Sequence, residues 1–104
     1  MATTRRQKLE AMLIDEPNDA ELRYMLAMEH VSEGDDEGAV RRFRELFEVT
    51  PDYPPAYHMA GRTLQRLGRL EEAREVLLRG IPLAEKRGDP HAAGEMQELL
   101  DNLD

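Results

Sequence analysis

Apolar residues recur at spacings of three and four along the chain and do not alternate singly with polar residues. Such spacing places apolar side chains on one face of a helix, whereas alternation would indicate a strand. Proline and glycine interrupt the pattern at regular intervals, which marks the ends of the segments. The pattern therefore predicts six helices, over residues 3–15, 19–33, 36–49, 54–67, 70–87 and 90–103.

Residues that favour helix starts stand before most of these segments. Aspartate and asparagine side chains accept hydrogen bonds from the first backbone N–H groups, and proline is tolerated in a first turn. The candidate capping residues are Asn18 or Asp19, Asp35 or Asp36, Asp52 and Asp89, and the prolines are Pro54 and Pro90. These residues support the predicted helix boundaries.

Pro82 disagrees with the pattern, because it lies inside the predicted helix 70–87. Proline in a helix removes one hydrogen bond and crowds the carbonyl four residues earlier, here that of Leu78. Either the helix bends near Gly80, or it ends there and a short new turn begins. Of the two, we favour the bend.

A shift of 34 residues superimposes the chain on itself. Small residues then recur where two helices would cross closely, and large apolar residues recur where they would fill the space between them. The matched pairs are Pro17 with Pro51, Gly34 with Gly68, Ala39 with Ala73, Phe43 with Leu77, Ala27 with Gly61 and Leu46 with Gly80. Six matches at a single shift indicate an internal repeat.

The repeat resembles the tetratricopeptide repeat, whose first helix carries an aromatic residue, Leu-Gly and Tyr, and whose second carries Ala, an aromatic residue and a closing Pro. The corresponding runs here are Arg23-x-x-Leu26-Ala27-x-x-His30, Ala39-x-x-x-Phe43 with Pro51, Tyr57-x-x-Ala60-Gly61-x-x-Leu64 and Ala73-x-x-x-Leu77. Two departures stand out. Arg23, with Tyr24 beside it, replaces the aromatic residue, and Glu85 replaces the second closing proline.

The resemblance implies an all-α fold of antiparallel helical hairpins, stacked as a short right-handed superhelix of about six helices. One hairpin cannot cover its own apolar face, so stacking supplies the core. Residues 1–104 are expected to form a single domain. Its parts are a half repeat (3–15), a first repeat (19–51), a second repeat (53–87) and a capping helix (90–103).

The resemblance also implies a function, because in this family the first helix of each repeat lines a concave groove. The implied function is a non-enzymatic adaptor that binds a peptide or an acidic protein segment there. The corresponding positions are Tyr24, Met28 and Val31 in the first repeat and His58, Arg62, Gln65 and Arg66 in the second, with Ala92, Met96 and Leu99 from the last helix.

Three of these residues, His58, Arg62 and Arg66, follow at intervals of four and so share one helix face. Arginine binds carboxylates in a bidentate geometry, so this face is a candidate clamp for an acidic segment. The alternative is a solvated face that pairs with the chain's own acids, for instance Glu29 or Glu33.

Tyr24 and Met28 are adjacent on a helix face and would form an apolar patch that suits varied ligands. The alternative is that Tyr24 packs in the place of the missing aromatic residue.

Composition and charge narrow the function classes. The net charge is −8, and an acidic protein gains nothing from counterion release, so nucleic acid is not an expected partner. No apolar stretch approaches the roughly 20 residues that span a bilayer, so no membrane partner is expected. The N-terminus lacks the apolar run of a secretory signal, so we expect a cytoplasmic protein.

Candidate chemistry is sparse. The chain has no cysteine, its histidines lack metal-binding spacing, and the acidic run 32–38 lacks the ligand pattern of a calcium loop. No phosphate-binding loop or nucleophile motif occurs. We therefore expect no cofactor, no metal and no enzymatic activity. The alternative function is structural: a weakly self-assembling homo-oligomer, or a fragment of a larger repeat array.

Overall fold

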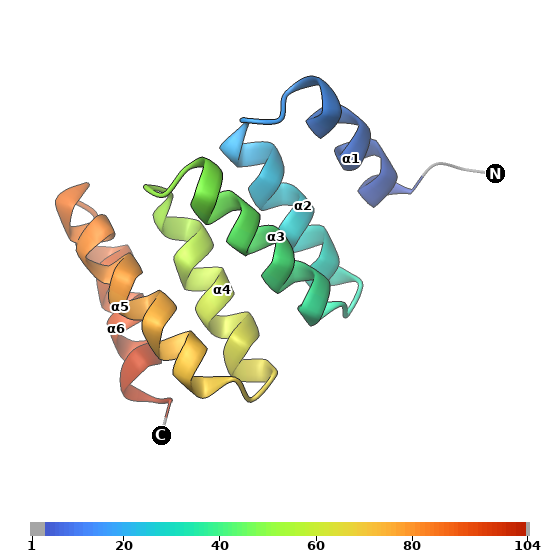
Figure 1. Cartoon of the computed structure of the whole chain (residues 1–104). Coiled ribbons are helices and arrows are strands. Elements are labelled where there is room, and N and C mark those ends of the chain that lie inside the picture. Colours follow the sequence, from blue (N-terminus) through green and yellow to red (C-terminus); the bar gives the residue numbers. More distant parts are fainter. Residues whose placement is uncertain (1–3, 104) are drawn as a thin grey trace. The chain divides into compact units, whose positions relative to one another are not determined.

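The computed structural model describes residues 4–103, and within that range it contains six helices and no strand (Figure 1). They are α1 (Arg5–Asp15), α2 (Ala20–Ser32), α3 (Asp36–Val49), α4 (Pro54–Arg66), α5 (Leu70–Lys86) and α6 (Pro90–Asp101). The all-α expectation is confirmed. Helix α3 has its predicted bounds, and the others begin or end one or two residues inside theirs. The predicted start of the first helix, at residue 3, lies outside the described residues.

The helices fall into two compact units, which meet in the sequence between Pro51 and Asp52. In the first unit, α2 and α3 form a hairpin and α1 packs on α2. In the second unit, α4 and α5 form the equivalent hairpin, and α6 packs on both of its helices. Each unit thus holds one full hairpin and one additional helix.

Three of the turns between helices share one backbone geometry, which depends on glycine. Gly34, Gly68 and Gly88 have φ values of 79°, 75° and 74°, a left-handed conformation in which a Cβ atom would be strained. Each lets the next N–H group reach a carbonyl five residues earlier. These bonds are Asp35 to His30 at 2.8 Å, Arg69 to Leu64 at 2.9 Å and Asp89 to Ala84 at 3.0 Å.

The capping predictions are confirmed at three helices. The Oδ1 atoms of Asp19, Asp35 and Asp89 accept hydrogen bonds from the backbone N–H groups of Leu22, Gly38 and Ala92 at 3.0, 3.0 and 3.1 Å. The prediction for Asp52 is wrong. The N-cap of α4 is Tyr53, whose side chain makes no capping bond, and Asp52 instead accepts from Arg87 Nε at 3.0 Å.

Pro82 lies inside α5, which continues without interruption to Lys86. The alternative in which the helix ends near Gly80 is therefore wrong, and the bend stays a prediction. Proline leaves the Leu78 carbonyl without its usual helical donor. The Leu78 side chain is 55% exposed and Pro82 is exposed as well, so this side of α5 faces solvent.

The second unit has a closely packed core in which glycine permits short distances between helices. Tyr57, Leu64, Leu77 and Met96 are almost fully buried. A Cβ atom at Gly80 would lie 2.6 Å from Tyr57 Cβ and 2.8 Å from Met96 Sδ, closer than real contacts allow. Gly61 is similarly close to Leu77. Gly61, which the overlay pairs with Ala27, therefore marks a close helix crossing as predicted, whereas Gly80 makes a close crossing at a position where the first repeat has Leu46.

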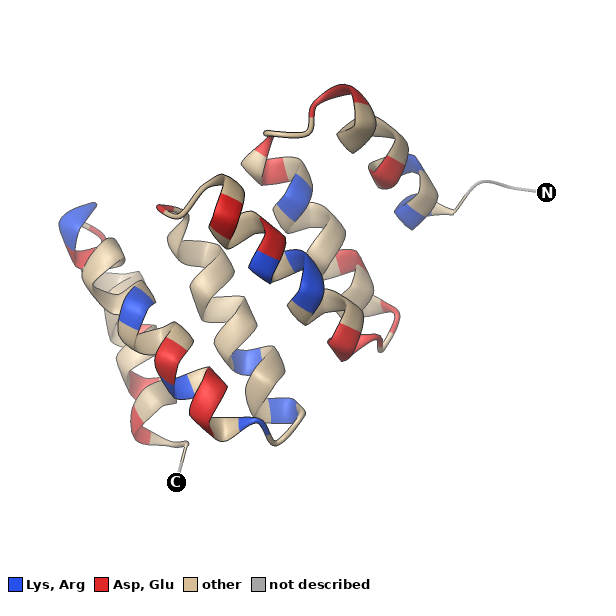
Figure 2. Cartoon of the chain, in the orientation of Figure 1, with Lys and Arg blue, Asp and Glu red and all other residues tan. Residues whose placement is uncertain are grey.

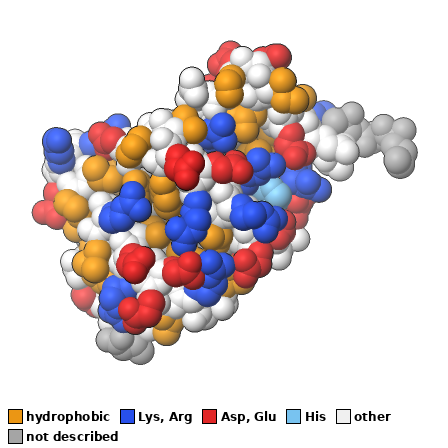
Figure 3. Space-filling model, viewed as in Figure 1, with side chains coloured by type: hydrophobic (Ala, Val, Ile, Leu, Met, Phe, Trp, Pro, Cys, Tyr) orange, Lys and Arg blue, Asp and Glu red, His pale blue; other side chains and the backbone are white. Residues whose placement is uncertain are grey.

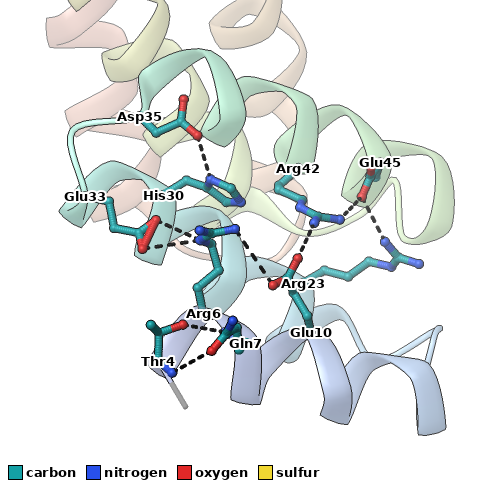
Figure 4. A network of polar contacts seen from close by, with 10 residues as sticks. All are labelled: Thr4, Arg6, Gln7, Glu10, Arg23, His30, Glu33, Asp35, Arg42 and Glu45. Atoms are coloured by element: carbon teal, nitrogen blue, oxygen red, sulfur yellow. Dashed lines mark hydrogen bonds and ion pairs between the residues drawn. The ribbon is translucent and has the colours of Figure 1, made fainter. Parts of the chain in front are cut away.

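The first unit has its core between α2 and α3, where Leu26, Phe43 and Leu46 are fully buried. Helix α1 is attached differently, because Leu9 is its single buried residue among those described. Ion pairs supplement that contact, as Figure 4 shows for part of the network. They join Arg5 to Glu29 at 3.0 Å, Arg6 to Glu33 at 3.0 Å and Arg42 to Glu10 at 3.3 Å.

Candidate functional site

An open hollow of about 370 Å³ lies between α4 and α6, entirely within the second unit. It contains three of the four site residues predicted from the second repeat. Its lining residues are His58, Arg62 and Gln65 from α4, Glu95, Glu98 and Leu99 from α6, and Asn102 just after α6. Half-buried Leu99 supplies an apolar contact among these polar side chains.

A second hollow of about 390 Å³ adjoins the first and shares His58 and Glu95 with it. It lies at the N-terminal ends of α4 and α6 and has a more apolar lining. Its other lining residues are Pro54, Pro55, Arg87, Asp89, His91 and Ala92. The two hollows together form one surface, called the α4–α6 groove below.

His58 occupies the point where the two hollows meet. Its side chain is 20% exposed, and its Nδ1 atom lies 3.9 Å from Glu95 Oε2. Burial lowers the pKa of His58 below its ordinary value of 6.5, Glu95 acts in the opposite direction, and Arg62 lowers the pKa further. His58 is therefore mostly uncharged at neutral pH, so the positive charge of this wall comes from arginine.

Arg62 is exposed on the groove wall, and its guanidinium makes no ion pair or hydrogen bond with any of residues 4–103. The acids that could have neutralised it, Glu29 and Glu33, instead pair with Arg5 and Arg6 inside the first unit. Arg66 is not brought into the groove lining. Its guanidinium donates to Thr63 Oγ1 on its own helix, at 3.3 Å.

The predicted site residues of the first repeat, Tyr24, Met28 and Val31, lie half-buried on α2 in the first unit. The Tyr24 ring packs against Phe43, with centroids 6.3 Å apart and planes inclined at 54°. Tyr24 thus contributes to the contact between α2 and α3, which supports the alternative that it replaces the missing aromatic residue. Arg23, beside it, donates to the Pro17 carbonyl at 2.8 Å.

The last helix contributes to the groove in a way that the sequence predicts only in part. Ala92 and Leu99 line it as expected. The expectation for Met96 is wrong, because that side chain is fully buried. Gly80 has no side chain, so α5 leaves room for Met96 in the core. The burial of Met96 therefore depends on a residue sixteen positions earlier in the chain.

The acidic wall of the groove, Glu95 and Glu98, is absent from the predicted site. A signal for it exists in the sequence, since Glu95, Glu98, Leu99 and Asn102 follow at helical spacing and share one face of α6. Glu95 contacts His91 on its own helix and faces His58. The Glu98 carboxylate makes no hydrogen bond or ion pair within the described part of the chain.

A second polar cluster lies outside the groove, at the turn between α2 and α3. His30 is 6% exposed, and its Nδ1 atom lies 2.9 Å from Asp35 Oδ2 (Figure 4). The Gly38 N–H group and, to a lesser degree, His30 lower the pKa of Asp35. A Cβ atom at Gly38 would overlap the Asp35 carboxylate and crowd His30 Nδ1, so a larger residue there would force these side chains to move. Residues 4–103 contain no group of three side chains suited to a metal ion.

Charges are distributed differently on the two walls and on the rest of the surface. On the face shown in Figure 3, acidic and basic side chains are interspersed. Helix α4 instead carries two arginines and no acid (Figure 2), whereas α6 carries three acids and no lysine or arginine. Within the described residues, no helix is long and apolar enough to cross a membrane.

Comparison with known proteins gives consistent matches. A family model described as tetratricopeptide repeat matches residues 30–99. A TPR repeat-containing protein of Pseudomonas aeruginosa is 32% identical over 96 residues, which cover 92% of this chain and 91% of that protein. The crystal structure of a tetratricopeptide repeat domain protein from Salinibacter ruber has a TM-score of 0.77 and 32% identity, covering 82% of this chain and 96% of that one. The solution structure of a Bordetella parapertussis protein has a TM-score of 0.82 and 28% identity. The match covers 98% of this chain and 89% of that one.

Proposed function

Since the chain belongs to the tetratricopeptide repeat family, we propose that it is a non-enzymatic adaptor that binds a segment of a partner protein in the α4–α6 groove. Members of this family are generally protein–protein interaction modules. The observation that supports this site most directly is Arg62, an exposed and unpaired guanidinium on a groove wall. A carboxylate of the partner would bind it through charge-assisted hydrogen bonds.

The shape of the groove supports an extended segment as its ligand. Pro55 and Gln65 both line it, and ten residues of α4 separate them by about 15 Å. An extended chain rises about 3.3 Å per residue, so the groove accommodates about four to five residues. The apolar contacts come from Pro54, Pro55 and Leu99, and the polar ones from Gln65 and Asn102.

The test is an NMR titration of the full chain, labelled with ¹⁵N, with pooled synthetic peptides of varied charge. Amide shifts are expected at His58, Arg62, Gln65 and Leu99. Arg62→Gln should weaken binding about tenfold, because a hydrogen bond to a charged group contributes about 1.5–3 kcal/mol. Lys86→Gln is the matched control, since Lys86 is exposed on α5 and does not line the groove. Shifts confined to α3 and α5 would contradict the proposal.

A second function, self-association, is favoured by two exposed apolar side chains of α1. Ile14 is 79% exposed and Met12 is 51% exposed, and they point to opposite sides of the helix. Light scattering across a dilution series tests it. A mass that falls on dilution, and that Ile14→Ser reduces to the monomer value, supports self-association. A constant monomer mass rules it out.

A further inference from the structure

We propose that the α4–α6 groove selects a protein segment that carries an acidic and a basic side chain together, and that it discriminates against a purely acidic segment. This inference rests on the proposed function and names the class of partner. It replaces the simpler expectation of an acidic ligand, which considers the arginine wall alone.

In the hollow of about 370 Å³, the two walls of the α4–α6 groove have opposite charge. On the α4 side, Arg62 lines the hollow and the helix has no acidic residue. On the α6 side, Glu95 and Glu98 line the same hollow and the helix has no lysine or arginine. A ligand between these helices therefore meets a positive charge on one side and negative charges on the other.

Two of these charges are available to a ligand. Arg62 and Glu98 line one hollow, yet neither pairs with the other or with a further residue in the range 4–103. The remaining acids of α6 have contacts already, since Glu95 contacts His91 and Asp101 accepts from Gln97 Nε2 at 2.9 Å. The hollow thus keeps one guanidinium and one carboxylate apart and unneutralised.

Electrostatic complementarity decides which segment fits these two groups. A purely acidic segment is attracted by Arg62 but repelled by Glu98. A purely basic segment is attracted by Glu98 but repelled by Arg62. A segment with both charges satisfies both walls. Leu99, half-buried in the lining of the same hollow, favours an apolar residue near the charged pair.

His58 does not alter this balance at neutral pH. The charged groups near His58 are Glu95 on α6 and Arg62 on α4. Burial lowers the pKa of His58, so the imidazole is mostly uncharged at neutral pH. Arg62 is therefore the one permanent positive charge that α4 contributes to the lining of this hollow.

The experiment measures fluorescence anisotropy of labelled seven-residue peptides with the full chain. One peptide carries Glu before a central Leu and Lys after it, and a second carries the same residues with the charges in reverse order. Three further peptides carry Glu at both charged positions, Lys at both, or Gln at both; they are called the acidic, basic and glutamine versions. We expect the better of the two mixed peptides to bind at least tenfold more tightly than the acidic, basic and glutamine versions.

Charge reversal of the protein gives the sharper readout. Arg62→Glu and Glu98→Arg should each weaken binding of the preferred mixed peptide at least tenfold. The double variant should bind tightly again but prefer the peptide with the opposite charge order. A change of preference cannot arise from unfolding, and thermal melts monitored by circular dichroism identify any variant that fails to fold. Lys86→Glu, with the same change of net charge as Arg62→Glu, should bind like the unmodified chain.

The outcomes separate this inference from the proposed function. If the acidic peptide binds as tightly as the mixed ones and Glu98→Arg strengthens that binding, the inference is overturned while the groove remains a binding site for acidic segments. If none of the peptides shifts amides of the groove, the proposed function fails and the inference fails with it.

Discussion

The first and second units follow one 34-residue pattern, but each attaches its additional helix by a different kind of contact. Helix α1 buries Leu9, with Leu13 partly buried beside it, and is joined to α2 and α3 by ion pairs between side chains that are 19–65% exposed. Helix α6 buries Ala93 and Met96, and Met96 packs where Gly80 allows α5 to come close. Exposed ion pairs are weak and screened by salt, whereas packed apolar contacts are neither.

The turns of the two hairpins show a similar contrast. Each has a glycine with positive φ followed by the same backbone hydrogen bond. In the first unit, Asp35 caps α3 and contacts buried His30. In the second unit, Arg69 takes the equivalent position and pairs with Glu72. The backbone of the turn is therefore conserved between the copies, while the side chains that support it have changed completely.

The largest expected effect concerns the close packing of the second unit. Gly80→Ala should lower the free energy of unfolding by about 1–3 kcal/mol, because its Cβ would collide with Tyr57 and Met96. Gly94→Ala on α6 is the control. A Cβ atom at Gly94 would have no neighbouring atom within 4 Å. Alanine is also more favourable than glycine inside a helix, by up to about 1 kcal/mol. Urea unfolding followed by circular dichroism measures both, and equal effects would contradict this account of α6.

A smaller effect is expected at α1. Arg6→Gln removes the pair with Glu33 and should lower the stability of α1 docking by about 0.2–1 kcal/mol. Lys8→Gln removes the same charge from an exposed residue of the same helix and should have no such effect. Salt at 1 M shortens the Debye length to about 3 Å and so weakens exposed ion pairs. Hydrogen exchange of α1 amides should therefore speed up in 1 M salt, while α6 amides stay protected. If salt accelerated hydrogen exchange equally in α1 and α6, the proposed difference between their attachments would be wrong.

The smallest effects concern pH, and the two units should respond at different values. The pKa of His58 is lowered below 6.5, so the unfolded chain binds protons more readily and the second unit loses stability as pH falls through and below 6.5. The pKa of Asp35 is lowered below 3.8, so its stabilisation of the first unit is complete above that pH and is lost as pH falls through the lower folded value.

Hydrogen exchange measured separately for α2 and α4 between pH 7 and pH 3 tests this order. His58→Gln should remove part of the loss in α4 as pH falls through and below 6.5, and Asp35→Asn should remove part of the loss in α2 as pH falls below 3.8. Loss of α2 protection before that of α4 would reverse the prediction.

Local features were predictable wherever a residue and its partner lie close in the chain. Asp19, Asp35 and Asp89 cap N–H groups three residues ahead, and the turn glycines act on their own backbone, so the helix boundaries follow within two residues. The exception is Asp52, because its hydrogen-bond partner Arg87 lies 35 residues away. The same limit applies to Met96, whose burial depends on Gly80.

By itself, the sequence determined the six helices, the 34-residue repeat and the arginine face of α4, since each depends on spacing within a few turns of chain. Only the tertiary structure decided that Arg62 shares a hollow with Glu98 while Arg66 does not line it. The physical reason is that a groove is defined by two helices, and the packing of α6 on α4 and α5 sets which side chains face each other. The spacing within α4 alone describes one wall.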